Sequence, residues 1–402
     1  MIVLIMKKIW ILTLGMFALG MDTYIVAGLL PDIGKSFNKS SAEIGQGVTV
    51  FTLFFALSAP VFSTILAKYS VKKILLLALL TFGLANLITM LSLNYSIYIL
   101  SRCIAGLGAG LFSPMAVSSG GHLVSQKNKG KALAFIVGGM SIGTVVGVPI
   151  GLQLANLINW RFAIGIIVIL SIVAFISIYF LLPDLKMPSA PSLKERFSLF
   201  IDPHVLRVVS VTVCEAIASF GLYTYLSQVI SEGISPHYIT LFLTTWGIGG
   251  LLGSFGVGLV IDKFKNTQIL MLIILVILGI SIVLIPTLIK IPILGLIPFI
   301  LWGAMGWATQ APQQHILLKN HSEHGSTSVA LNSSLNYLGS AIGAALGGLL
   351  LAQGASTNIL IYCFFAIVII GIIIQIINVF IDMNSIELKI NSIKYKAHYY
   401  LI

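Results

Sequence analysis

Charged residues are scarce in this chain of 402 residues. They make up 9% of the sequence, against 58% hydrophobic residues, and the mean hydropathy is +1.05. A soluble domain of this size needs far more charge to cover its surface. Apolar runs of about 20 residues, the length that crosses a membrane, recur from Ile9 to Ile381. The shortage of charge therefore excludes a soluble protein and predicts an integral membrane protein.

Cysteine is also scarce, and the patterns typical of catalytic and metal sites are missing. Cys103, Cys214 and Cys363 fall inside apolar runs, at spacings that fit neither a metal site nor a disulfide framework. No His-Glu-x-x-His pattern occurs, and the pair Gly130-Lys131 lacks the other residues of a phosphate-binding loop. We therefore expect no metal, no cofactor, no enzymatic activity and no direct use of ATP by this chain.

Acidic residues are few, and the basic excess follows a membrane topology. The chain has 23 Lys and Arg against 12 Asp and Glu, and cytoplasmic loops of membrane proteins collect basic residues. With a cytoplasmic N-terminus, the outer side holds only Lys35, Lys39, Arg161 and Lys290, and nearly all the others fall in cytoplasmic segments. We expect a bacterial inner (plasma) membrane protein with both termini in the cytoplasm, no nucleic-acid partner and a monomeric state.

Twelve apolar stretches predict an all-helical protein with twelve transmembrane helices. We expect helices at 9–31, 43–66, 73–93, 96–119, 132–157, 162–182, 205–230, 237–260, 268–288, 292–314, 326–352 and 357–381. The longest polar stretch, residues 183–204, contains three prolines and has the character of a linker. The predicted domains are a six-helix bundle over 1–182, a cytoplasmic linker over 183–204, a second six-helix bundle over 205–381 and a cytoplasmic tail over 382–402.

The two halves carry a repeated glycine pattern. Three glycines at every fourth position in the fifth helix recur 196 residues later in the eleventh: Gly143, Gly147 and Gly151, then Gly339, Gly343 and Gly347. Two bundles related by an internal repeat, with a site between them, are typical of transporters that work by alternating access. The repeat therefore favours a transporter.

Three charged residues lie deep in the predicted spans. Asp22 lies roughly 13 residues into the first helix, about 20 Å from the cytoplasmic side. Arg102 lies roughly 6 residues into a descending helix, about 21 Å from the same side of a core about 30 Å thick. Because these depths coincide, we predict an Asp22–Arg102 pair. Glu215 lies near mid-depth, close to the repeat equivalent of Asp22.

These charges suggest proton coupling. Charges in hydrocarbon are costly, by about 3 kcal/mol for arginine on insertion scales, and they usually mark function. A carboxyl group removed from water binds a proton more readily, so it can take a proton from outside and release it inside. If substrate binds the deprotonated form, the result is exchange. We predict this role for Asp22, Arg102 and Glu215; the alternative for the first two is a static ion pair between helices.

Several segments carry a family resemblance. The segment Gly258-Leu-Val-Ile-Asp262-Lys263 follows the eighth helix, and the segment from Arg102 to Gly110 has three spaced glycines. With the twelve spans, these segments resemble the major facilitator superfamily over nearly the whole chain. The resemblance implies two pseudo-symmetric six-helix bundles and an arginine, Arg102, that is implicated in proton coupling. It also implies a cytoplasmic gating motif at Lys68, Lys72, Lys73, Gly258, Asp262 and Lys263.

The first-half copy of the gating motif is degraded, because Ala67 stands where an aspartate is usual in that family. A gating salt bridge at position 67 is therefore excluded. Membrane topology alone is the other explanation for the lysines around it.

The fifth helix resembles the motif that the same superfamily associates with antiporters, at Gly139, Gly143, Gly147, Pro149 and Gly151. Glycine at every fourth position leaves a bare helix face that a neighbour can approach closely, and the proline favours a bend. We expect the eighth helix to pack there through Gly249, Gly250, Gly253 and Gly256. Tight packing without a role in transport is the alternative.

Two further segments, Tyr24 to Pro31 and Asn159 to Phe162, resemble one bacterial branch of this superfamily. That branch is the twelve-helix drug–proton antiporters, which include arabinose-efflux-like permeases, purine-efflux proteins and chloramphenicol-resistance exporters. Candidate contacts in a substrate cavity are the aromatic and amide side chains of the later helices and of the first: Tyr24, Tyr223, Tyr225, Trp246, Trp307, Gln310, Asn332 and Asn336. Packing or anchoring at the membrane interface is the alternative for each.

We therefore predict a secondary transporter that exports a small organic compound, such as a drug, a sugar or a purine, by proton antiport. The expected partners are that substrate, protons and the lipid bilayer. An uptake symporter or an uncoupled facilitator of the same fold remains open, as does a membrane sensor without transport.

Overall fold

The computed structural model describes residues 2–66, 68–125, 128–184, 201–261, 263–264, 266–320 and 325–399. In these residues all regular secondary structure is helical. Twelve helical stretches are long and apolar enough to cross a membrane. The predicted fold class and number of spans are confirmed, and an even number of crossings puts both ends of the described chain on one side of the membrane. We call this side the terminal side.

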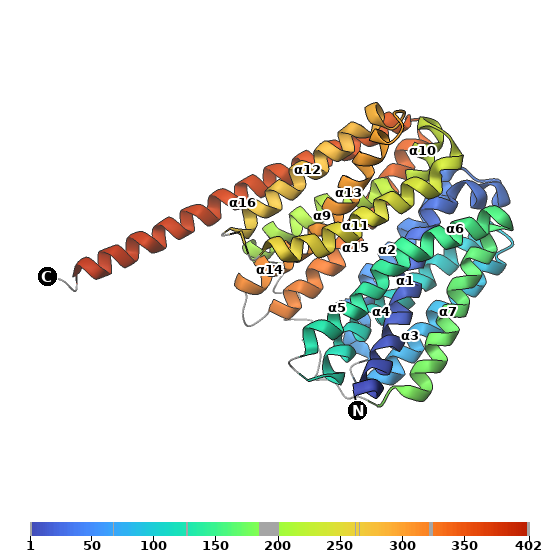
Figure 1. The fold of residues 1–402 in the computed structure, drawn as a ribbon, viewed down its shortest axis with the longest axis horizontal. Helices are drawn as coiled ribbons and strands as arrows, with labels where there is room; N and C mark the ends of the chain where they lie inside the picture. Colours follow the sequence, from blue (N-terminus) through green and yellow to red (C-terminus); the bar gives the residue numbers. More distant parts are fainter. Residues whose placement is uncertain are drawn as a thin grey trace.

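The first six spans form one group in Figure 1, drawn in blue to green. They are α1 (Ile2–Phe37), α2 (Ser41–Ile65), α3 (Val71–Leu91), α4 (Tyr95–Leu123), the segment α5 (Lys129–Ile142), η2 (Gly143–Gly147) and α6 (Val148–Leu157), and α7 (Trp160–Leu181). Within this group α4 packs on both α2 and α3, and α1 packs on α5 and α7. We call this group the first bundle.

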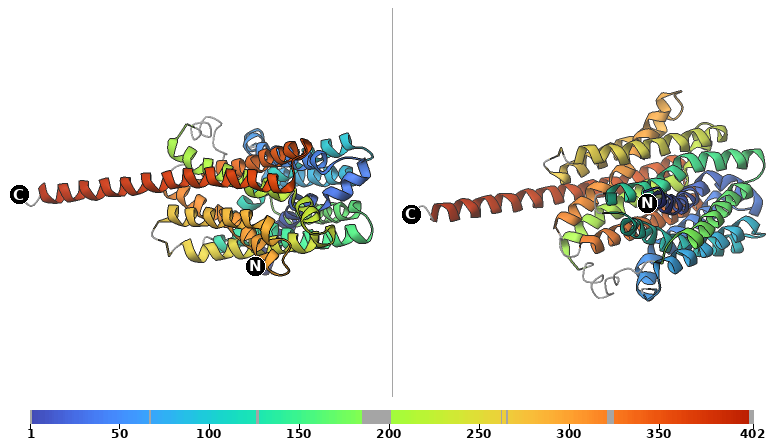
Figure 2. Two further views of the ribbon diagram at one scale, coloured as in Figure 1. Left: turned by 90° about the horizontal axis from the view of Figure 1, so that it is seen from above. Right: turned by 60° about the horizontal axis from the view of Figure 1, so that its bottom comes forward.

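The last six spans form the second bundle, drawn in yellow-green to red (Figure 1). They are α9 (Pro203–Thr224) with α10 (Leu226–Gly233), η3 (Pro236–Tyr238) with α11 (Ile239–Ile261), α12 (Thr267–Leu288), η4 (Leu294–Leu296) with α13 (Ile297–Ala308) and α14 (Gln310–Asn320), α15 (Gly325–Ala352) and α16 (Thr357–Tyr399). In both views of Figure 2 the last part of α16 projects beyond the rest of the molecule. Most of the predicted linker, residues 185–200, lies outside the described residues.

Side-chain caps mark the beginnings of several spans. The side chains of Asn94, Asn159 and Asn266 accept hydrogen bonds from backbone N–H groups in the first turn of α4, α7 and α12. Asp202 does the same for α9. A cap of this kind satisfies an N–H group that the helix itself leaves unpaired. The sequence therefore encodes these helix starts locally.

Three predicted helices are interrupted, which the apolar pattern alone did not show. The tenth span breaks at Thr309, because Pro312 cannot donate a hydrogen bond to the carbonyl of Ala308. The seventh breaks at Tyr225, whose backbone leaves the helical region and whose hydroxyl donates to the Ala344 carbonyl at 2.6 Å. The fifth contains the π-helical segment η2, which ends two residues before Pro149.

The eighth span does contact the fifth, where a Cβ atom at Gly247 would lie 3.2 Å from Val145, but the predicted glycine faces do not pack on each other. A Cβ atom added at Gly139, Gly143 or Gly147 would meet Thr13, Phe17 or Met21, all of which belong to α1. The glycines of the eighth span, Gly249, Gly250 and Gly253, face α13 instead, and a Cβ atom at Gly256 would meet no atom within 4 Å. The glycine faces of the fifth and eighth spans thus allow close packing between helices of the same bundle.

The same packing recurs in the second bundle and explains the correction. Cβ atoms at Gly339, Gly343 and Gly347 would meet Ala216, Ile217 and Tyr225, which belong to α9 and to the break after it. The fifth span therefore packs on the first as the eleventh packs on the seventh. The repeated glycines are a signature of the repeated bundle, and the interface between bundles is built by other residues.

The two bundles meet chiefly through α2 and α15. Tyr225 lies between them near the side opposite the termini: Cβ atoms at Gly45 and Gly348 would lie 2.5 Å and 2.6 Å from its hydroxyl oxygen. Deeper in the membrane the Phe55 ring stacks on Tyr337, with centroids 3.7 Å apart. In Figure 1 the bundles lie closest where α10 and α6 end and spread apart toward α5 and α14.

Candidate functional site

The first bundle contains a buried ion pair at the depth the sequence predicted. Arg102 of α4 donates from Nη1 to Oδ1 of Asp22 in α1 at 2.8 Å. Both side chains are removed from the surface, with exposed fractions of 1% and 0%. The two residues are therefore in contact, as their coinciding depths indicated.

An amide and a phenyl ring complete this pair. Asn86 of α3 donates from Nδ2 to Oδ2 of Asp22 at 3.4 Å, and its Oδ1 accepts from Arg102 at 3.4 Å. The Arg102 guanidinium carbon lies 4.4 Å from the centroid of the Phe51 ring of α2, a distance typical of a cation–π contact. Four helices thus meet at one charged pair. We call Asp22, Asn86, Arg102 and Phe51 the paired site.

Close backbone contacts allow this meeting. A Cβ atom at Gly106 would meet the Phe51 carbonyl, and one at Gly108 would lie 2.7 Å from the Phe82 nitrogen. These glycines therefore let α4 approach α2 and α3 closely enough for Arg102 to reach its partners. This is a physical role for the spaced glycines that follow Arg102 in the sequence.

Neither Asp22 nor Arg102 lines the cavity between the bundles. The cavity described below is lined by Thr23 and Thr52, the neighbours of Asp22 and Phe51 along the chain. Because successive helix residues point about 100° apart, Asp22 turns into the bundle while Thr23 turns toward the cavity. In this conformation Asp22 is therefore separated from that cavity.

Glu215 of α9, the third predicted charge, has very different surroundings. Its side chain is fully buried. Among the residues that the structure describes, neither carboxyl oxygen has a hydrogen-bond partner and no basic side chain lies within 4 Å. The hydroxyls of Ser219 and Thr309 lie nearby; Thr309 donates to the Gly306 carbonyl, whereas Ser219 accepts from the Trp302 indole and still has its own hydrogen to donate. An unsatisfied buried polar group costs about 1–3 kcal/mol. Binding of a ligand or of a proton would therefore stabilise this carboxyl group.

A cluster of neutral polar side chains surrounds Thr212, which lies one turn earlier on the same helix. Thr212 of α9 donates toward Oε1 of Gln313 at 2.7 Å and is also in contact with Asn332. Nε2 of Gln313 has no partner among the described residues. The predicted cavity residue Asn332 is thus buried inside the second bundle, bonded to α9 and α14.

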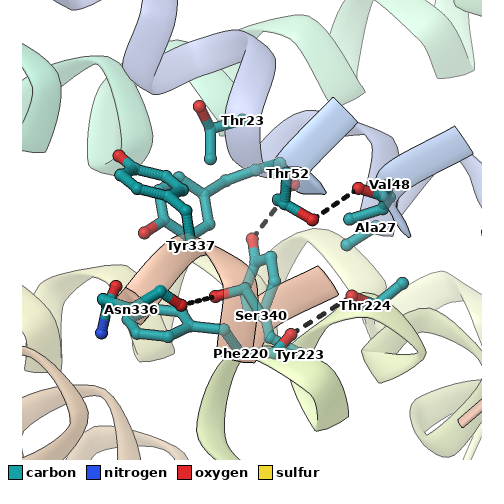
Figure 3. A pocket seen from close by; sticks show the side chains of 11 residues that line it. Thr23, Ala27, Val48, Thr52, Phe220, Tyr223, Thr224, Asn336, Tyr337 and Ser340 are labelled. Atoms are coloured by element: carbon teal, nitrogen blue, oxygen red, sulfur yellow. Dashed lines mark hydrogen bonds between the residues drawn. The ribbon is translucent and has the colours of Figure 1, made fainter. Parts of the chain in front are cut away.

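A cavity lies between the bundles, with a volume of about 40 Å³, room for very few water molecules. Figure 3 shows the side chains around it, which come from α1, α2, α9 and α15. Of the predicted contacts, Tyr24, Tyr223 and Asn336 line it. The other lining residues are Thr23, Ala27, Val48, Thr52, Phe220, Thr224, Tyr337 and Ser340.

The hydroxyl groups around this cavity have a common orientation. Thr23, Thr52, Thr224 and Ser340 each donate to a backbone carbonyl one turn earlier in their own helix, as Figure 3 shows for Thr52 and Ser340. Their hydrogen atoms are used, and their oxygen lone pairs remain free to accept. The cavity wall therefore offers several hydrogen-bond acceptors, together with one donor, Nδ2 of Asn336, which has no partner among the described residues.

An aromatic cluster borders the cavity around Tyr24. Four rings of the second bundle surround the Tyr24 ring, with centroid distances of 5.4, 5.7, 6.0 and 6.2 Å for Tyr223, Trp246, Trp307 and Phe220. The Tyr223 hydroxyl also donates to the Tyr24 carbonyl at 3.3 Å. The indole N–H groups of Trp246 and Trp307 have no acceptor in the described part of the chain.

The remaining predicted cavity residues lie elsewhere. Tyr225 fills the contact between the bundles near the side opposite the termini, and Gln310 begins α14, half-buried. Sequence reasoning missed Phe51 of the paired site, most of the cavity lining and three buried polar residues, Asn86, Thr212 and Gln313. A lone amide in an apolar helix is a signal that identifies Asn86 and Gln313 in retrospect.

The predicted gating residues lie on the terminal side. Lys68 and Lys72 place their ammonium groups 5.2 Å and 5.8 Å from the ring centroids of Tyr69 and Tyr179. Lys73 and Lys263 are exposed. Asp262 lies outside the described residues, and a Cβ atom at Gly258 would meet no atom within 4 Å. These positions carry no ion pair among the described residues.

Comparison with known proteins agrees with this architecture. The sequence model described as Major Facilitator Superfamily matches residues 12–344. An uncharacterized MFS-type transporter, YbcL of Bacillus subtilis (strain 168), is 29% identical over 350 residues, which cover 85% of this chain and 88% of that protein.

Two proteins of Escherichia coli (strain K12) are also similar. The inner membrane transport protein YdhP is 26% identical over 85% of this chain and 88% of its own length. The putative transporter AraJ is 25% identical over 88% of this chain and 90% of its own length.

Proposed function

This chain belongs to the major facilitator superfamily and is a multi-pass membrane transporter, and we propose that it exports a small organic compound in exchange for protons. The proton-binding group in this proposal is Asp22, and Arg102 is the cation that its ionised form holds. The proposal places the protein in a bacterial inner membrane with the terminal side in the cytoplasm, in line with the distribution of lysine and arginine.

The observation that carries the proposal is the path along α2 from the paired site to the other bundle. Phe51 lies on the Arg102 guanidinium, Thr52 lines the cavity, and Phe55 stacks on Tyr337 across the interface. A change in the paired site therefore acts on a helix that also contacts the cavity and the second bundle. A chain of packed groups of this kind can carry coupling between two sites.

Protonation of Asp22 supplies that change. The neutral acid loses its charge attraction for Arg102, and the guanidinium must then find another acceptor or move toward water. In the proposed cycle, Asp22 takes its proton when the side opposite the termini is open. It releases the proton toward the cytoplasm, and the ionised form favours the substrate-bound state.

The conformation seen here fits one stage of that cycle. Tyr225, Gly45 and Gly348 are in close contact near the side opposite the termini, and the cavity between the bundles is too small for an organic substrate. Opening on either side therefore requires the bundles to move relative to one another, which is the motion that alternating access uses.

Accumulation assays test the proposal. Cells that express the chain, and cells with an empty vector, are loaded with labelled arabinose, hypoxanthine, chloramphenicol or ethidium under an imposed pH gradient. We expect at least one compound to fall several-fold in the expressing cells, with the effect lost when a protonophore collapses the gradient.

Other outcomes point to the rival functions. Higher accumulation in the expressing cells indicates an uptake symporter, and gradient-independent equilibration indicates an uncoupled facilitator. Equal levels of all four compounds, with the protein present in the membrane, contradict transport of these classes and favour a sensor.

A further inference from the structure

The second bundle holds a set of buried groups that lack partners. The two carboxyl oxygens of Glu215 and the indole N–H groups of Trp246 and Trp307 have no hydrogen-bond partner among the residues that the structure describes. Native proteins leave few buried polar atoms unsatisfied, and such atoms often mark a site for a ligand, a water molecule or an ion. Their clustering around one tyrosine is therefore informative.

These groups lie close together. A Cβ atom at Gly306 would lie 3.7 Å from Oε1 of Glu215, and Glu215 lies close enough to Tyr24 to interact electrostatically with its hydroxyl. Trp307 and Trp246 lie 5.7 Å apart between ring centroids, and both contact the Tyr24 ring. A single carboxyl group is thus set beside a group of aromatic faces.

The Tyr24 ring comes from the first bundle and occupies the centre of this aromatic group. On its other side Tyr24 lines the cavity between the bundles. It therefore separates the cavity from Glu215. Phe220 and Tyr223 already line the cavity. If the Tyr24 side chain turns away, or the bundles separate, the two tryptophan rings and the carboxyl group become continuous with it.

We propose that Glu215, together with the rings of Phe220, Tyr223, Trp246 and Trp307, binds an aromatic organic cation, and that Tyr24 occupies this site when no ligand is bound. Aromatic faces attract a cation that lies within about 6 Å of the ring centroid. A carboxylate that lacks a counter-ion gains one when such a ligand binds. This inference names a substrate class for the proposed exporter and therefore rests on that function.

The cavity wall fits the same ligand. The hydroxyl groups of Thr23, Thr52, Thr224 and Ser340 present free lone pairs because their hydrogen atoms bond to helix carbonyls. Such a wall suits a ligand that donates hydrogen bonds, as amino groups on an aromatic ring do. The lining residues carry no charge, so Glu215 is the charge that selects among ligands.

Equilibrium binding to the purified full-length chain tests this inference, without a proton gradient. The probes are ethidium, which is an aromatic cation with two amino groups, and dihydroethidium, its neutral reduced form of nearly the same shape, kept under anaerobic conditions. We expect ethidium to bind at least tenfold more tightly than dihydroethidium.

Variants locate the site. Glu215→Gln should weaken ethidium binding at least tenfold and leave dihydroethidium binding unchanged. Asp32→Asn, which removes an exposed carboxylate that pairs with Lys35, serves as the control and should change neither. Trp307→Phe should weaken ethidium binding, while Trp10→Phe, at an exposed tryptophan, should not. Tyr24→Ala should tighten ethidium binding because the site is then empty.

The outcomes separate this inference from the proposed function. Equal binding of the two probes, or unchanged ethidium binding by Glu215→Gln, overturns the cation site even if proton-driven export of another compound is found. Weaker ethidium binding by Tyr24→Ala overturns the placement of Tyr24 as the occupant. Selective ethidium binding that depends on Glu215 supports the site, even if no proton-driven export is found.

Discussion

The two bundles hold their buried acids in opposite ways. In the first, Asp22 contacts a guanidinium and an amide, and a phenyl ring covers the guanidinium. In the second, Glu215 is equally buried, but no described residue contacts its oxygens as a hydrogen-bond partner. The comparison shows that buried carboxyl groups in a membrane protein can have different roles. An acid that is paired with a cation can stabilise one conformation, whereas an acid without a partner can bind a cationic ligand or a proton.

Breaking the paired site should have the largest effect on stability. Asp22→Leu leaves Arg102 buried without its partner, and Arg102→Met leaves Asp22 in the same condition. Removing one partner of a buried pair costs about 3–5 kcal/mol. We expect each single variant to lose that much unfolding free energy in detergent. The double variant should recover most of the loss, and additive losses would show that the pair does not interact.

The second-largest effect on stability should come from the glycine contact between the fifth span and α1. Gly143→Val places a side chain against the Phe17 carbonyl of α1, a backbone group that cannot move aside alone. Overpacking of this kind costs about 1–3 kcal/mol. Gly138→Val is the matched control on the same helix, since a Cβ atom there would meet no atom within 4 Å. Equal thermal stability of both variants would contradict the described packing of α5 and η2 on α1.

The unpaired acid should behave in the opposite way to the paired one. Glu215→Met removes a polar group that lacks partners and keeps most of the side-chain volume. Such replacements are often neutral or stabilising. We expect the unfolding free energy to stay within about 1 kcal/mol of wild type or to rise. A loss as large as that of Asp22→Leu would mean that Glu215 has a stabilising partner, and the contrast between the bundles would disappear.

The smallest effect should come from an exposed pair at the end of the first bundle. Lys39 donates to Glu43 at 2.7 Å, and this hydrogen bond raises the pKa of the Lys39 ammonium above its ordinary value of 10.5. A raised folded-state pKa stabilises the protein fully below the ordinary value, and the contribution disappears as pH rises through the raised one. Lys39→Met should therefore slightly lower the melting temperature at pH 8. The difference from wild type should shrink as pH rises above the ordinary value, and a constant difference would contradict the pairing.

The extent to which the sequence predicts the structure differs between backbone and side chains. The twelve spans follow from apolar runs, and the Asp22–Arg102 contact follows from two depths along straight helices. The partners of the glycine stripes do not follow, because periodicity shows that a helix face is bare and leaves open which neighbour covers it. Gly143 packs on Phe17 as Gly343 packs on Ile217. These partners can be identified only from the three-dimensional structure.

The residues that line the cavity are likewise only partly predictable from the sequence. Tyr24 and Tyr223 were predicted from residue type and do line it, whereas Tyr225, only two residues further, lies in the contact between the bundles. The break in the helix at Tyr225 decides this orientation, and hydropathy carries no signal for it. Asn332 likewise turns into the second bundle because Thr212 and Gln313 bond to it.

Transport by the Asp22→Asn variant tests the proton-coupling role most directly. Asparagine keeps the shape of the side chain and an oxygen for Arg102, but it cannot exchange a proton. In inside-out membrane vesicles we expect this variant to lose gradient-driven uptake of the compound that the wild-type chain expels. It should still exchange labelled for unlabelled compound without a gradient. Gradient-driven uptake equal to wild type would contradict the account.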